Sequence, residues 1–270
     1  MLIANSAVCS GTRISSWVKI NEPISASKVK PFTPLPKVST WHLASLNLGE
    51  NRGDAPENVI ENYRRLGEAT GIRTDHMAFT RQVHGNDVRI VTEADVHTLM
   101  GGVPYDADGV VTNIPGLAII AFVADCVPLL LHDPVNKVAA AVHCGWRSTV
   151  ADIMGVAVEK MVSLGAEPKE IRGAVGASIG YCCFEVGPEV PEAVFALLPD
   201  DHEGLVRAGE KEGKFYVDLR EAIARRLVQL GLKRENILVS EECTVCSHDK
   251  YWSHRYTQGN RGTQAALIML

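Results

Sequence analysis

The chain has 270 residues, of which 46% are hydrophobic and 22% are charged, and its formal net charge is -5. This ordinary globular balance excludes intrinsic disorder, which requires low hydrophobicity and high net charge. Because the chain is slightly acidic and has no run of lysines and arginines, it lacks the footprint of a phosphate-backbone binder. We therefore expect a folded protein with no nucleic-acid partner.

The sequence also argues against a membrane or secreted protein. The longest apolar stretch, residues 116–131, is interrupted by Asp125 and Pro128 and is shorter than the roughly 20 residues that cross a bilayer. The first residues lack a charged leader followed by a sustained apolar stretch, so we expect no signal peptide. Seven cysteines, an odd number, do not resemble a disulfide framework. We expect a cytoplasmic protein without a membrane partner, and nothing in the sequence predicts a protein partner.

The first half of the chain is predicted to contain one helix and a series of short strands. Residues 1–40, rich in Ser, Pro and Lys from residue 13 on, show no lasting periodicity and are expected to be irregular or edge structure. A helix capped by Asp54 should end at Gly67 or Gly71. Runs of β-branched residues predict strands at 87–92, 109–112, 117–124, 129–132 and 138–143. The last three are spaced as in a β-meander or hairpins, without room for the crossover helices of a doubly wound sheet.

The second half is predicted to contain two amphipathic helices and two strands. One helix follows the turn at 145–147, carries an apolar stripe through Leu164 and ends at Gly165. The other is capped by Asp218 and ends at Gly231. Strands are expected at 236–240 and 265–270. With no repeat and no linker after residue 40, the pattern predicts one α+β domain spanning residues 1–270.

Two residues that can bind a metal end strongly apolar strands in VADCVPLLLHDPVNKVAAAVHCGWRS, namely Cys126 and His143. A thiolate and a neutral imidazole are good zinc ligands, and strand ends can converge in a pocket. His84, in the turn-like QVHG segment, is the best third ligand, and three protein ligands leave one position for water or substrate. Their spacing matches no local metal motif. Cys126 and His143 could equally be core residues.

A second group of cysteines lies near the end of the sequence. Cys243-x-x-Cys246, followed by His248 and His254, has some features of a second zinc site or a redox pair. A structural zinc site usually needs four ligands at compact spacing, and a redox pair of the thioredoxin type needs a βαβ setting. Neither condition is met in the sequence, so no site is assigned here. Residues 182–183, two adjacent cysteines, are interpreted as loop or core.

Six segments occur together in a recognisable order: SLNLGENRGD, RQVHGNDV, DADGVVTN, VADCVPLLLHD, AAVHCGWRS and GASIGYCCFEVG. Over residues 43–270 the chain resembles the multicopper polyphenol oxidase (laccase-like) family, whose members are regarded as purine nucleoside phosphorylases with adenosine deaminase activity. The resemblance implies that His84, Cys126 and His143 bind the metal, zinc or alternatively copper. It implies purine nucleosides and phosphate as substrates. The expected fold is an α/β/β/α-like sandwich of mixed β-sheet layers flanked by helices.

Several positions depart from the family pattern. Cys144 stands where Ala usually follows the ligand His, Ala177 stands where Pro is usual, and residues 251–255 read YWSHR in place of an FSYRR type of string. These departures affect the segments from which substrate contacts are expected. The choice of nucleoside among adenosine, inosine and methylthioadenosine therefore stays open.

Four further residues are candidates for the site. Asp125 can serve as a base or orient a ligand, but beside a metal-binding Cys on a strand it can also face away. Arg147, four residues after His143, can bind phosphate with its guanidinium or pair with a surface carboxylate. These two are the catalytic candidates. Asn47 and Gln82 can bind the base or ribose, or can cap turns.

Other functions use the same residues differently. A metal-free cysteine hydrolase or deamidase would use Cys126 as nucleophile and His143 as base. A copper-dependent oxidase is a further reading, since two histidines and a cysteine also form a blue-copper ligand set, although no His-x-His pair is present. A binding protein without catalysis is the remaining alternative.

Overall fold

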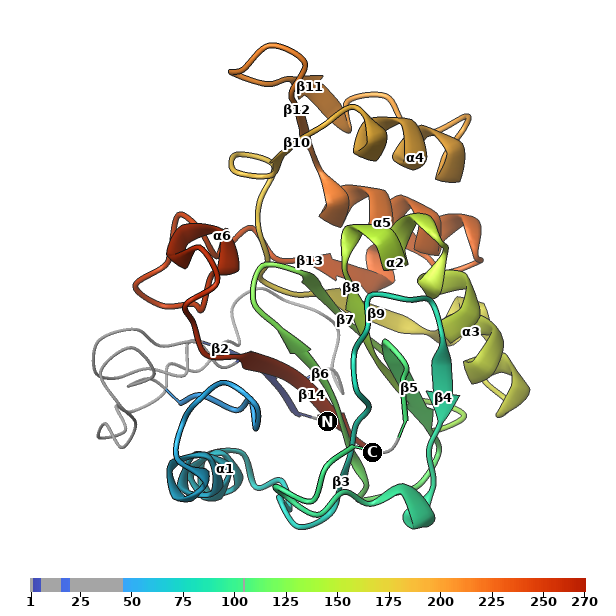
Figure 1. The fold of residues 1–270 in the computed structure, drawn as a ribbon. Helices are drawn as coiled ribbons and strands as arrows, with labels where there is room; N and C mark the ends of the chain where they lie inside the picture. Colours follow the sequence, from blue (N-terminus) through green and yellow to red (C-terminus); the bar gives the residue numbers. More distant parts are fainter. Residues whose placement is uncertain (1, 6–15, 20–45, 104) are drawn as a thin grey trace.

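The computed structural model describes residues 2–5, 16–19, 46–103 and 105–270, and its main elements form four layers (Figure 1). Two β-sheets pack face to face. Helix α1 (Pro56–Thr70) covers the outer face of one sheet. The outer face of the other is covered by α2 (Trp146–Val150), α3 (Ile153–Ser163) and α5 (Leu219–Gln229). The expected α+β sandwich of the α/β/β/α type is confirmed.

Both large sheets are mixed. The five-stranded sheet runs, in order, β2 (Ser16–Lys19), β1 (Leu2–Asn5), β14 (Gln264–Met269), β6 (Ala118–Val123), β3 (Met77–Ala78). The six-stranded sheet runs β13 (Ile237–Val239), β9 (Arg172–Val175), β7 (Val127–Asp133), β8 (Val138–Cys144), β5 (Gly109–Thr112), β4 (Val88–Ile90). Short 3₁₀ helices are η3 (Glu93–Asp95), η4 (Pro168–Glu170) and η5 (Arg234–Asn236).

The alternation of side chains along the strands fills the layers of core between these elements. On β7, Leu129 and Leu131 face the helices, whereas Leu130 faces the other sheet. On β6, Ile119 faces the six-stranded sheet and Ile120 packs under α1. Each of these strands is therefore apolar on both faces, and for this reason each forms an uninterrupted hydrophobic segment of the sequence.

Of the strands between residues 117 and 143, the last two form an expected hairpin, but the three do not form a meander. β7 and β8 are an antiparallel pair, with Leu129 opposite Val142, but β6 pairs with β14 and β3 in the other sheet. The chain crosses from one sheet to the other at residues 124–126, where Asp125 has a positive φ of 82°. The meander expectation is thus wrong for β6, because spacing along the chain does not distinguish a hairpin from a turn between stacked sheets.

The helices begin and end mostly where the sequence indicates. α1 ends at Gly71, which is left-handed, but its N-cap is Ala55, while Asp54 accepts hydrogen bonds from the N–H of Ala55 and the side chain of Asn58. The single helix expected before Gly165 is two helices. The break is at Asp152, whose φ is 59°.

The side chain of Asp152 caps α3 through Gly155 N–H and accepts a hydrogen bond of 2.6 Å from Arg226 of α5. These two interactions hold the left-handed residue between the helices. Helix α5 has Asp218 as its cap, bonded to the N–H of Glu221, as expected.

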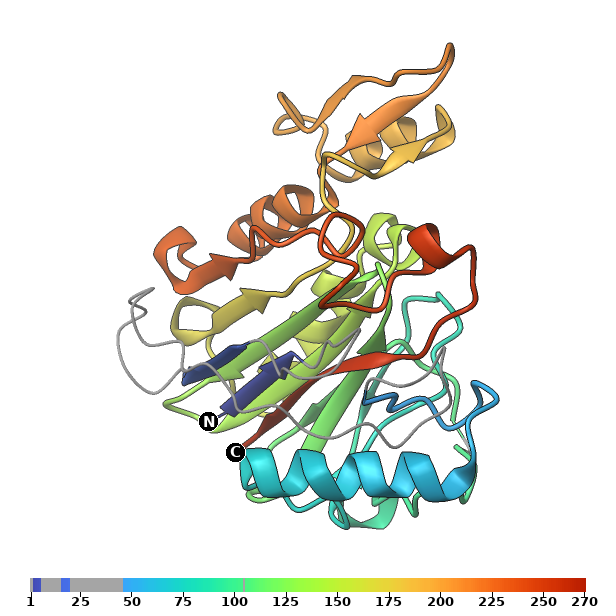
Figure 2. The ribbon, with the colours of Figure 1, turned by 90° about the vertical axis from the view of Figure 1, so that its left-hand side faces the viewer.

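A small sheet and α4 (Glu189–Leu197), which the sequence analysis did not predict, project from one end of the sandwich (Figure 2). The sheet has the order β10 (Glu185–Val186), β12 (Phe215–Val217), β11 (Val206–Ala208), and α6 (His254–Thr257) is the last helix. β2 and β1 lie at one side of the five-stranded sheet, and the rest of the expectation for residues 1–40 lies outside the described residues. No helix in the described part of the chain has the length and apolar character to span a membrane.

Candidate metal centre and adjoining pocket

Three potential metal ligands converge from three separate segments. His84 precedes β4, Cys126 lies at the turn between β6 and β7, and His143 lies near the end of β8. Their donor atoms all lie within 4.8 Å of one another, with 3.9 Å between His84 Nε2 and Cys126 Sγ. The two imidazole rings are nearly perpendicular, at 86°. Cys126 lies 42 positions after His84 and 17 positions before His143 in the sequence. The crossing of the chain between the two sheets brings these three residues together.

A buried carboxylate, Asp108, shapes the loop that carries His84. Asp108 is 1% exposed, and its two oxygens accept hydrogen bonds from the backbone N–H groups of Val83, His84 and Gly85, at 2.7 to 3.1 Å. His84 itself has a φ of 62°, a left-handed conformation that is uncommon for non-glycine residues. Three convergent N–H donors hold that conformation, so the loop geometry depends on Asp108.

The same carboxylate orients the second histidine. Asp108 Oδ1 is 2.8 Å from Nδ1 of His143, which leaves Nε2 of that ring for a metal. Although burial raises the pKa of Asp108, hydrogen bonds from His143 and Gly85 outweigh it and lower that pKa. Asp108 was not among the predicted site residues. It is the second Asp of DADGVV at the start of β5, and only its pairing with β8 reveals its partner.

The electrostatics of the trio favour a thiolate. Burial alone would raise the pKa of Cys126, but hydrogen bonds with His143 and His84 lower it to about 6. Burial would likewise lower the pKa of His143, but its hydrogen bonds to Asp108 and Cys126 raise it to about 9. Both shifts favour a thiolate at Cys126 and an imidazolium at His143 when no metal is bound. Cys144 is fully buried, and desolvation raises its pKa strongly.

The residue after Cys144 must be small. A Cβ on Gly145 would lie 2.9 Å from Cδ2 of His84 and 3.6 Å from Sγ of Cys126. Gly145 is also the residue at which the chain leaves β8 and begins α2. Its lack of a side chain lets the backbone pass directly beside the ligands.

A pocket of about 590 Å³ opens over the trio. One wall is aromatic, formed by Phe79 and Phe122, whose rings meet edge to face at 5.0 Å. The lining also includes Arg52, Arg261 and Thr263. Aromatic side chains beside convergent polar groups are typical of small-molecule sites.

Arg261 is the most unusual polar residue of this pocket. Burial, together with the charge of Arg52, lowers its pKa to about 10. Its Nε is buried and has no hydrogen-bond partner among the described residues, whereas its NH1 donates to Thr263 Oγ1. A guanidinium in this state is suited to an anionic ligand. The sequence analysis missed Arg261 and Arg52, because both stand in Gly- and Asn-rich stretches that resemble surface loops.

The two predicted substrate-binding residues have main-chain partners. Gln82 lines the pocket, but its amide makes two bonds of 2.7 Å with the N–H and C=O of Phe122. Asn47 is fully buried, accepts from the N–H groups of Gly49 and Thr263, and is not among the lining residues. Both side chains therefore join the loops that form the pocket.

The two predicted catalytic residues do not line this pocket. The carboxylate of Asp125 accepts hydrogen bonds of 2.6 Å from the hydroxyl of Thr244 and from the N–H of Arg255. Arg147 is exposed, and its guanidinium lies 4.3 Å from the ring centroid of Trp146. The structure thus brings His84, Cys126, His143 and Gln82 together at the pocket but not Asp125 or Arg147.

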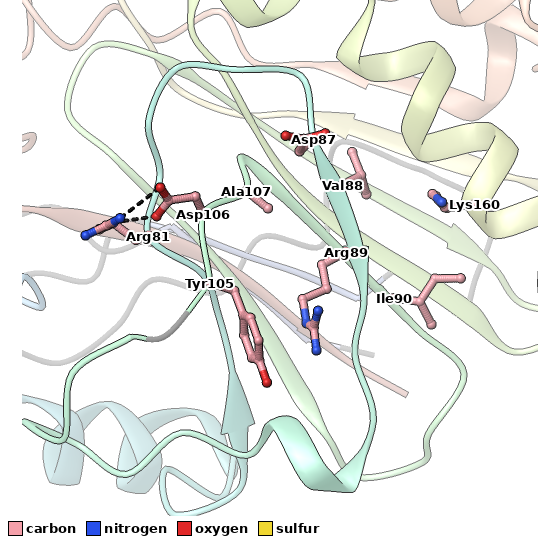
Figure 3. A pocket seen from close by; sticks show the side chains of 9 residues that line it. All are labelled: Arg81, Asp87, Val88, Arg89, Ile90, Tyr105, Asp106, Ala107 and Lys160. Carbon is pink, nitrogen blue, oxygen red and sulfur yellow. Dashed lines mark hydrogen bonds and ion pairs between the residues drawn. The ribbon is translucent and has the colours of Figure 1, made fainter.

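A second cavity, of about 580 Å³, is lined by Arg81, Lys160 and residues 87–90 and 105–107 (Figure 3). Its arginines already have partners: Arg81 forms an ion pair with Asp106, and Arg89 bonds to Asp95 at 2.8 Å while covering the ring of Tyr105. None of the three convergent metal ligands lines it. The pocket over the trio is therefore the candidate functional site.

Comparison with protein families agrees with this geometry. The family model described as multi-copper polyphenol oxidoreductase laccase matches residues 32–270. The chain belongs to this laccase family. The match covers His84, Cys126 and His143, and also Arg52 and Arg261 of the pocket. The six motifs of the sequence analysis fall in the same range.

Relatives of this laccase-family chain carry enzyme names. It is 32% identical over 262 residues to "Purine nucleoside phosphorylase YlmD" of Geobacillus stearothermophilus, covering 93% of each chain. It is 33% identical over 226 residues to "Adenosine deaminase RL5" of an unknown prokaryotic organism, covering 81% of this chain and 84% of that one. The crystal structure of YlmD matches with a TM-score of 0.82 at 31% identity, covering 87% of this chain and 88% of that chain.

Proposed function

We propose that this protein is a zinc-dependent purine nucleoside phosphorylase that also deaminates adenosine, and that it works in the cytoplasm. The observation that carries the proposal is the convergence of His84, Cys126 and His143 at a pocket that offers both an aromatic wall and a buried guanidinium. The names of its relatives, one a phosphorylase and one a deaminase, support the same pair of reactions.

The chemistry of the donor set fits zinc. Two imidazoles and a thiolate are an established ligand combination, and the sulfur and nitrogen ligands of tetrahedral zinc lie roughly 3.6 Å apart. The 3.9 Å between His84 Nε2 and Cys126 Sγ is close to that value. The Asp108–His143 hydrogen bond is the outer-shell contact that zinc-binding histidines usually make. Zinc held here would act as a Lewis acid, lowering the pKa of a water to about 7 and neutralising charge on a phosphate oxygen.

The pocket divides into parts that suit a nucleoside and phosphate. The purine packs on Phe79 and Phe122, where aromatic faces are available. Phosphate lies by Arg52 and Arg261, where its negative charge relieves the repulsion between the two guanidinium groups. The ribose is then held between the base and the phosphate.

In phosphorolysis a phosphate oxygen bonds to the ribose carbon C1′ as the C1′–N9 bond breaks, and the departing purine takes up a proton. The arginines orient the phosphate for attack at that carbon and balance its charge. In deamination a water oxygen adds to the purine carbon C6 and ammonia leaves. Both reactions need only one small reactant beside a purine nucleoside, so one pocket can serve both.

The test is to incubate zinc-loaded protein with adenosine, inosine or methylthioadenosine, with and without phosphate, and to separate free base from deaminated nucleoside. We expect phosphate-dependent release of free base, and phosphate-independent formation of inosine from adenosine. Replacement of His84, Cys126 or His143 by Ala should abolish both. Arg73→Ala, at an exposed arginine outside the pocket, is the control and should keep both activities. No turnover of any nucleoside by zinc-loaded protein would refute the proposal.

One alternative is favoured by a specific observation. Cys126, His143 and Asp108 form a chain of hydrogen-bonded groups like the nucleophile, base and orienting acid of a cysteine hydrolase. The presence of His84 at the same point argues for a metal instead, because such a hydrolase does not need it. Full activity in protein stripped of metal, together with inactivation by a thiol reagent at Cys126, would establish the alternative. Stoichiometric copper with oxidase turnover would support the oxidase reading.

A further inference from the structure

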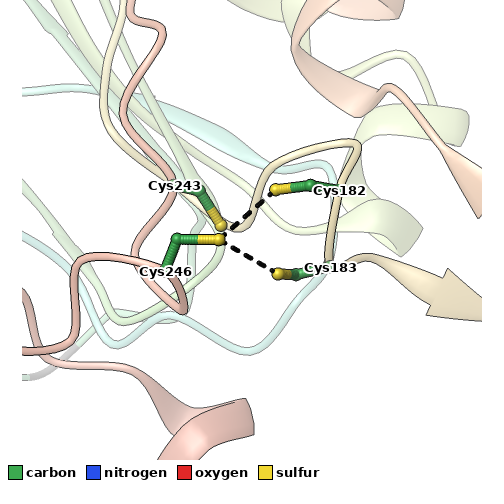
Figure 4. A group of neighbouring side chains, drawn as sticks. All are labelled: Cys182, Cys183, Cys243 and Cys246. Atoms are coloured by element: carbon green, nitrogen blue, oxygen red, sulfur yellow. Dashed lines mark hydrogen bonds between the residues drawn. The ribbon is translucent and has the colours of Figure 1, made fainter.

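Four cysteines gather at a second place in the molecule, outside the pocket. Cys182 and Cys183, interpreted from the sequence as loop or core, lie beside Cys243 and Cys246 (Figure 4). Their four sulfur atoms all lie within 4.8 Å of one another, and Figure 4 shows them pointing toward a common centre. A four-cysteine site needs two cysteines besides the CxxC pair, and these come from a segment some 60 residues earlier in the chain.

The distances between these sulfur atoms suit a metal better than a disulfide. Cys246 Sγ is 3.6 Å from the sulfur of Cys182 and 3.5 Å from that of Cys183. With Zn–S bonds of about 2.3 Å, two sulfurs of a tetrahedral site lie roughly 3.8 Å apart, whereas a disulfide bond is about 2.05 Å long. All four cysteines are free.

The backbone around the cluster is built for close approach. A turn in which the N–H groups of Cys183 and Phe184 both donate to Gly180 C=O, at 2.9 Å, lets two adjacent cysteines face the same way. A Cβ on Gly180 would lie 3.1 Å from Cβ of Cys243 and 3.2 Å from Sγ of Cys182. Glycine at 180 thus allows the two segments to meet.

Hydrogen bonds and nearby positive charge also suit thiolates. The N–H of Gly180 donates to Sγ of Cys243 at 3.2 Å, a contact typical of the outer shell of metal-bound sulfur. Arg255 donates to the carbonyl of Cys183, and Arg220 donates to the carbonyl of Glu242, next to Cys243. Two guanidinium groups beside the cluster can balance the negative charge of a zinc ion bound by four thiolates.

We propose that Cys182, Cys183, Cys243 and Cys246 bind a second zinc ion, with all four thiols releasing their protons to solvent as they become ligands. His248 and His254 are not part of the site. His248 bonds to the carbonyl of Val245 and stacks on Tyr256, and neither histidine belongs to the converging group.

This second zinc ion would link two segments of the chain, and both segments also contact the turn that carries Cys126. Thr244 lies between the two cysteines of the CxxC pair, and its hydroxyl donates to Asp125, the residue before Cys126. Ile179, just before the turn of Cys182, donates its N–H to the carbonyl of Asp125. Fixing the 180–184 and 243–246 segments together therefore also fixes the turn that carries Cys126.

The test is zinc stoichiometry of the full chain after saturation with zinc and removal of the excess. We expect about two zinc ions per chain for the natural protein and about one for each of two double variants, His84→Ala/His143→Ala and Cys182→Ser/Cys246→Ser. Cys182 and Cys246 are exposed, so Ser fits there without disturbing the core. The control is Cys144→Ala, which should keep both ions.

A spectroscopic measurement identifies the ligands independently of activity. Cobalt bound to His84→Ala/His143→Ala should show strong thiolate-to-metal charge transfer from an all-sulfur site, and Cys182→Ser/Cys246→Ser should lose that signal. Zinc-free His84→Ala/His143→Ala protein would overturn the proposal. So would loss of two hydrogens in the intact mass, with a disulfide mapped between Cys246 and Cys182 or Cys183. Both measurements concern only the second cluster, so their results do not depend on whether the protein acts on nucleosides.

Discussion

Asp108 supports two ligands at once. Its buried carboxylate fixes the left-handed loop of His84 through three backbone N–H groups and orients the ring of His143. Because one side chain serves both histidines, its loss should affect the metal site more than the loss of a residue that supports only one of them.

Asp108→Asn is expected to weaken zinc binding at the first site by about 10- to 100-fold, because an amide can no longer accept all four hydrogen bonds. The measurement is competition with a zinc-binding dye, carried out in the Cys182→Ser/Cys246→Ser background so that only one site is titrated. Asp106→Asn, two residues away and exposed, is the control. Equal affinity in both variants would show that Asp108 does not support the site.

The thiol of Cys126 should react at unusually low pH in metal-free protein. Only the thiolate is alkylated, and the thiolate fraction rises with pH through the pKa, which hydrogen bonds with His143 and His84 lower to about 6 despite burial. Alkylation of Cys126, followed by peptide mass spectrometry, should therefore be half-maximal near pH 6. His143→Ala should move the midpoint upward, and Cys144 should stay unmodified. A midpoint near the ordinary thiol value would contradict the assigned thiolate–imidazolium pair.

Arg261→Ala should raise the KM for phosphate by about tenfold or more, since a hydrogen bond to a charged group contributes about 1.5–3 kcal/mol and a tenfold change corresponds to about 1.4 kcal/mol. Phosphate-independent deamination should change much less. Initial rates over a range of phosphate concentrations give both values. Arg147→Ala is the informative comparison, because the sequence pointed to Arg147 and the structure points to Arg261.

The sequence predicts the three converging side chains of this site, His84, Cys126 and His143, better than their surroundings. The trio could be named because strand ends and family motifs both mark it. The role of Asp108 could not be predicted, because the number of hydrogen bonds that a carboxylate accepts from backbone N–H groups depends on how a loop folds around it. Gln82 and Asn47 look like substrate contacts in the sequence, yet their amides bond to the main chain.

At the scale of elements, the junction of β8 and α2 lies directly beside His84, Cys126 and His143. A methyl group at position 145 would press against the ring of His84. Gly145→Ala is therefore expected to reduce zinc affinity and both activities, while far-ultraviolet circular dichroism stays unchanged. Gly173→Ala is the matched control, since its Cβ would meet Leu131 at an ordinary 3.4 Å. Unaltered zinc affinity in Gly145→Ala would mean that the ligands shift without cost.

Strand positions could be predicted, but not the sheet to which each strand belongs. Apolar, β-branched runs mark β6, β7 and β8 equally well, and these runs do not show that the chain passes from one sheet to the other at Asp125.

The break between α2 and α3 could not be predicted from the sequence either. The apolar stripe continues across it, and only the contacts of Asp152 with Gly155 and Arg226 show why the helix stops.

At the scale of the whole molecule, bound zinc should add to stability, because each ion joins segments that are far apart in the chain. A ligand at a thousandfold excess over its Kd stabilises by about 4 kcal/mol, and 1 kcal/mol shifts Tm by about 2–4 °C in a chain of this size. Chelation should therefore lower the Tm of zinc-loaded protein by about 10 °C for each of the two ions, measured by calorimetry. A variant lacking both ligand sets should show no such fall. An unchanged Tm in the natural protein would contradict zinc binding at both sites.

The place of β14 has a consequence for how the chain is made. In the five-stranded sheet β14 lies between β1 and β6, so the described strand that is synthesised last joins two strands made long before it. Until it arrives, the apolar β6 has an unpaired edge, and such edges can associate with other chains. A nascent chain of this protein should therefore depend on chaperones until β14 is made, and truncation just before residue 264 should yield aggregates rather than a smaller folded protein.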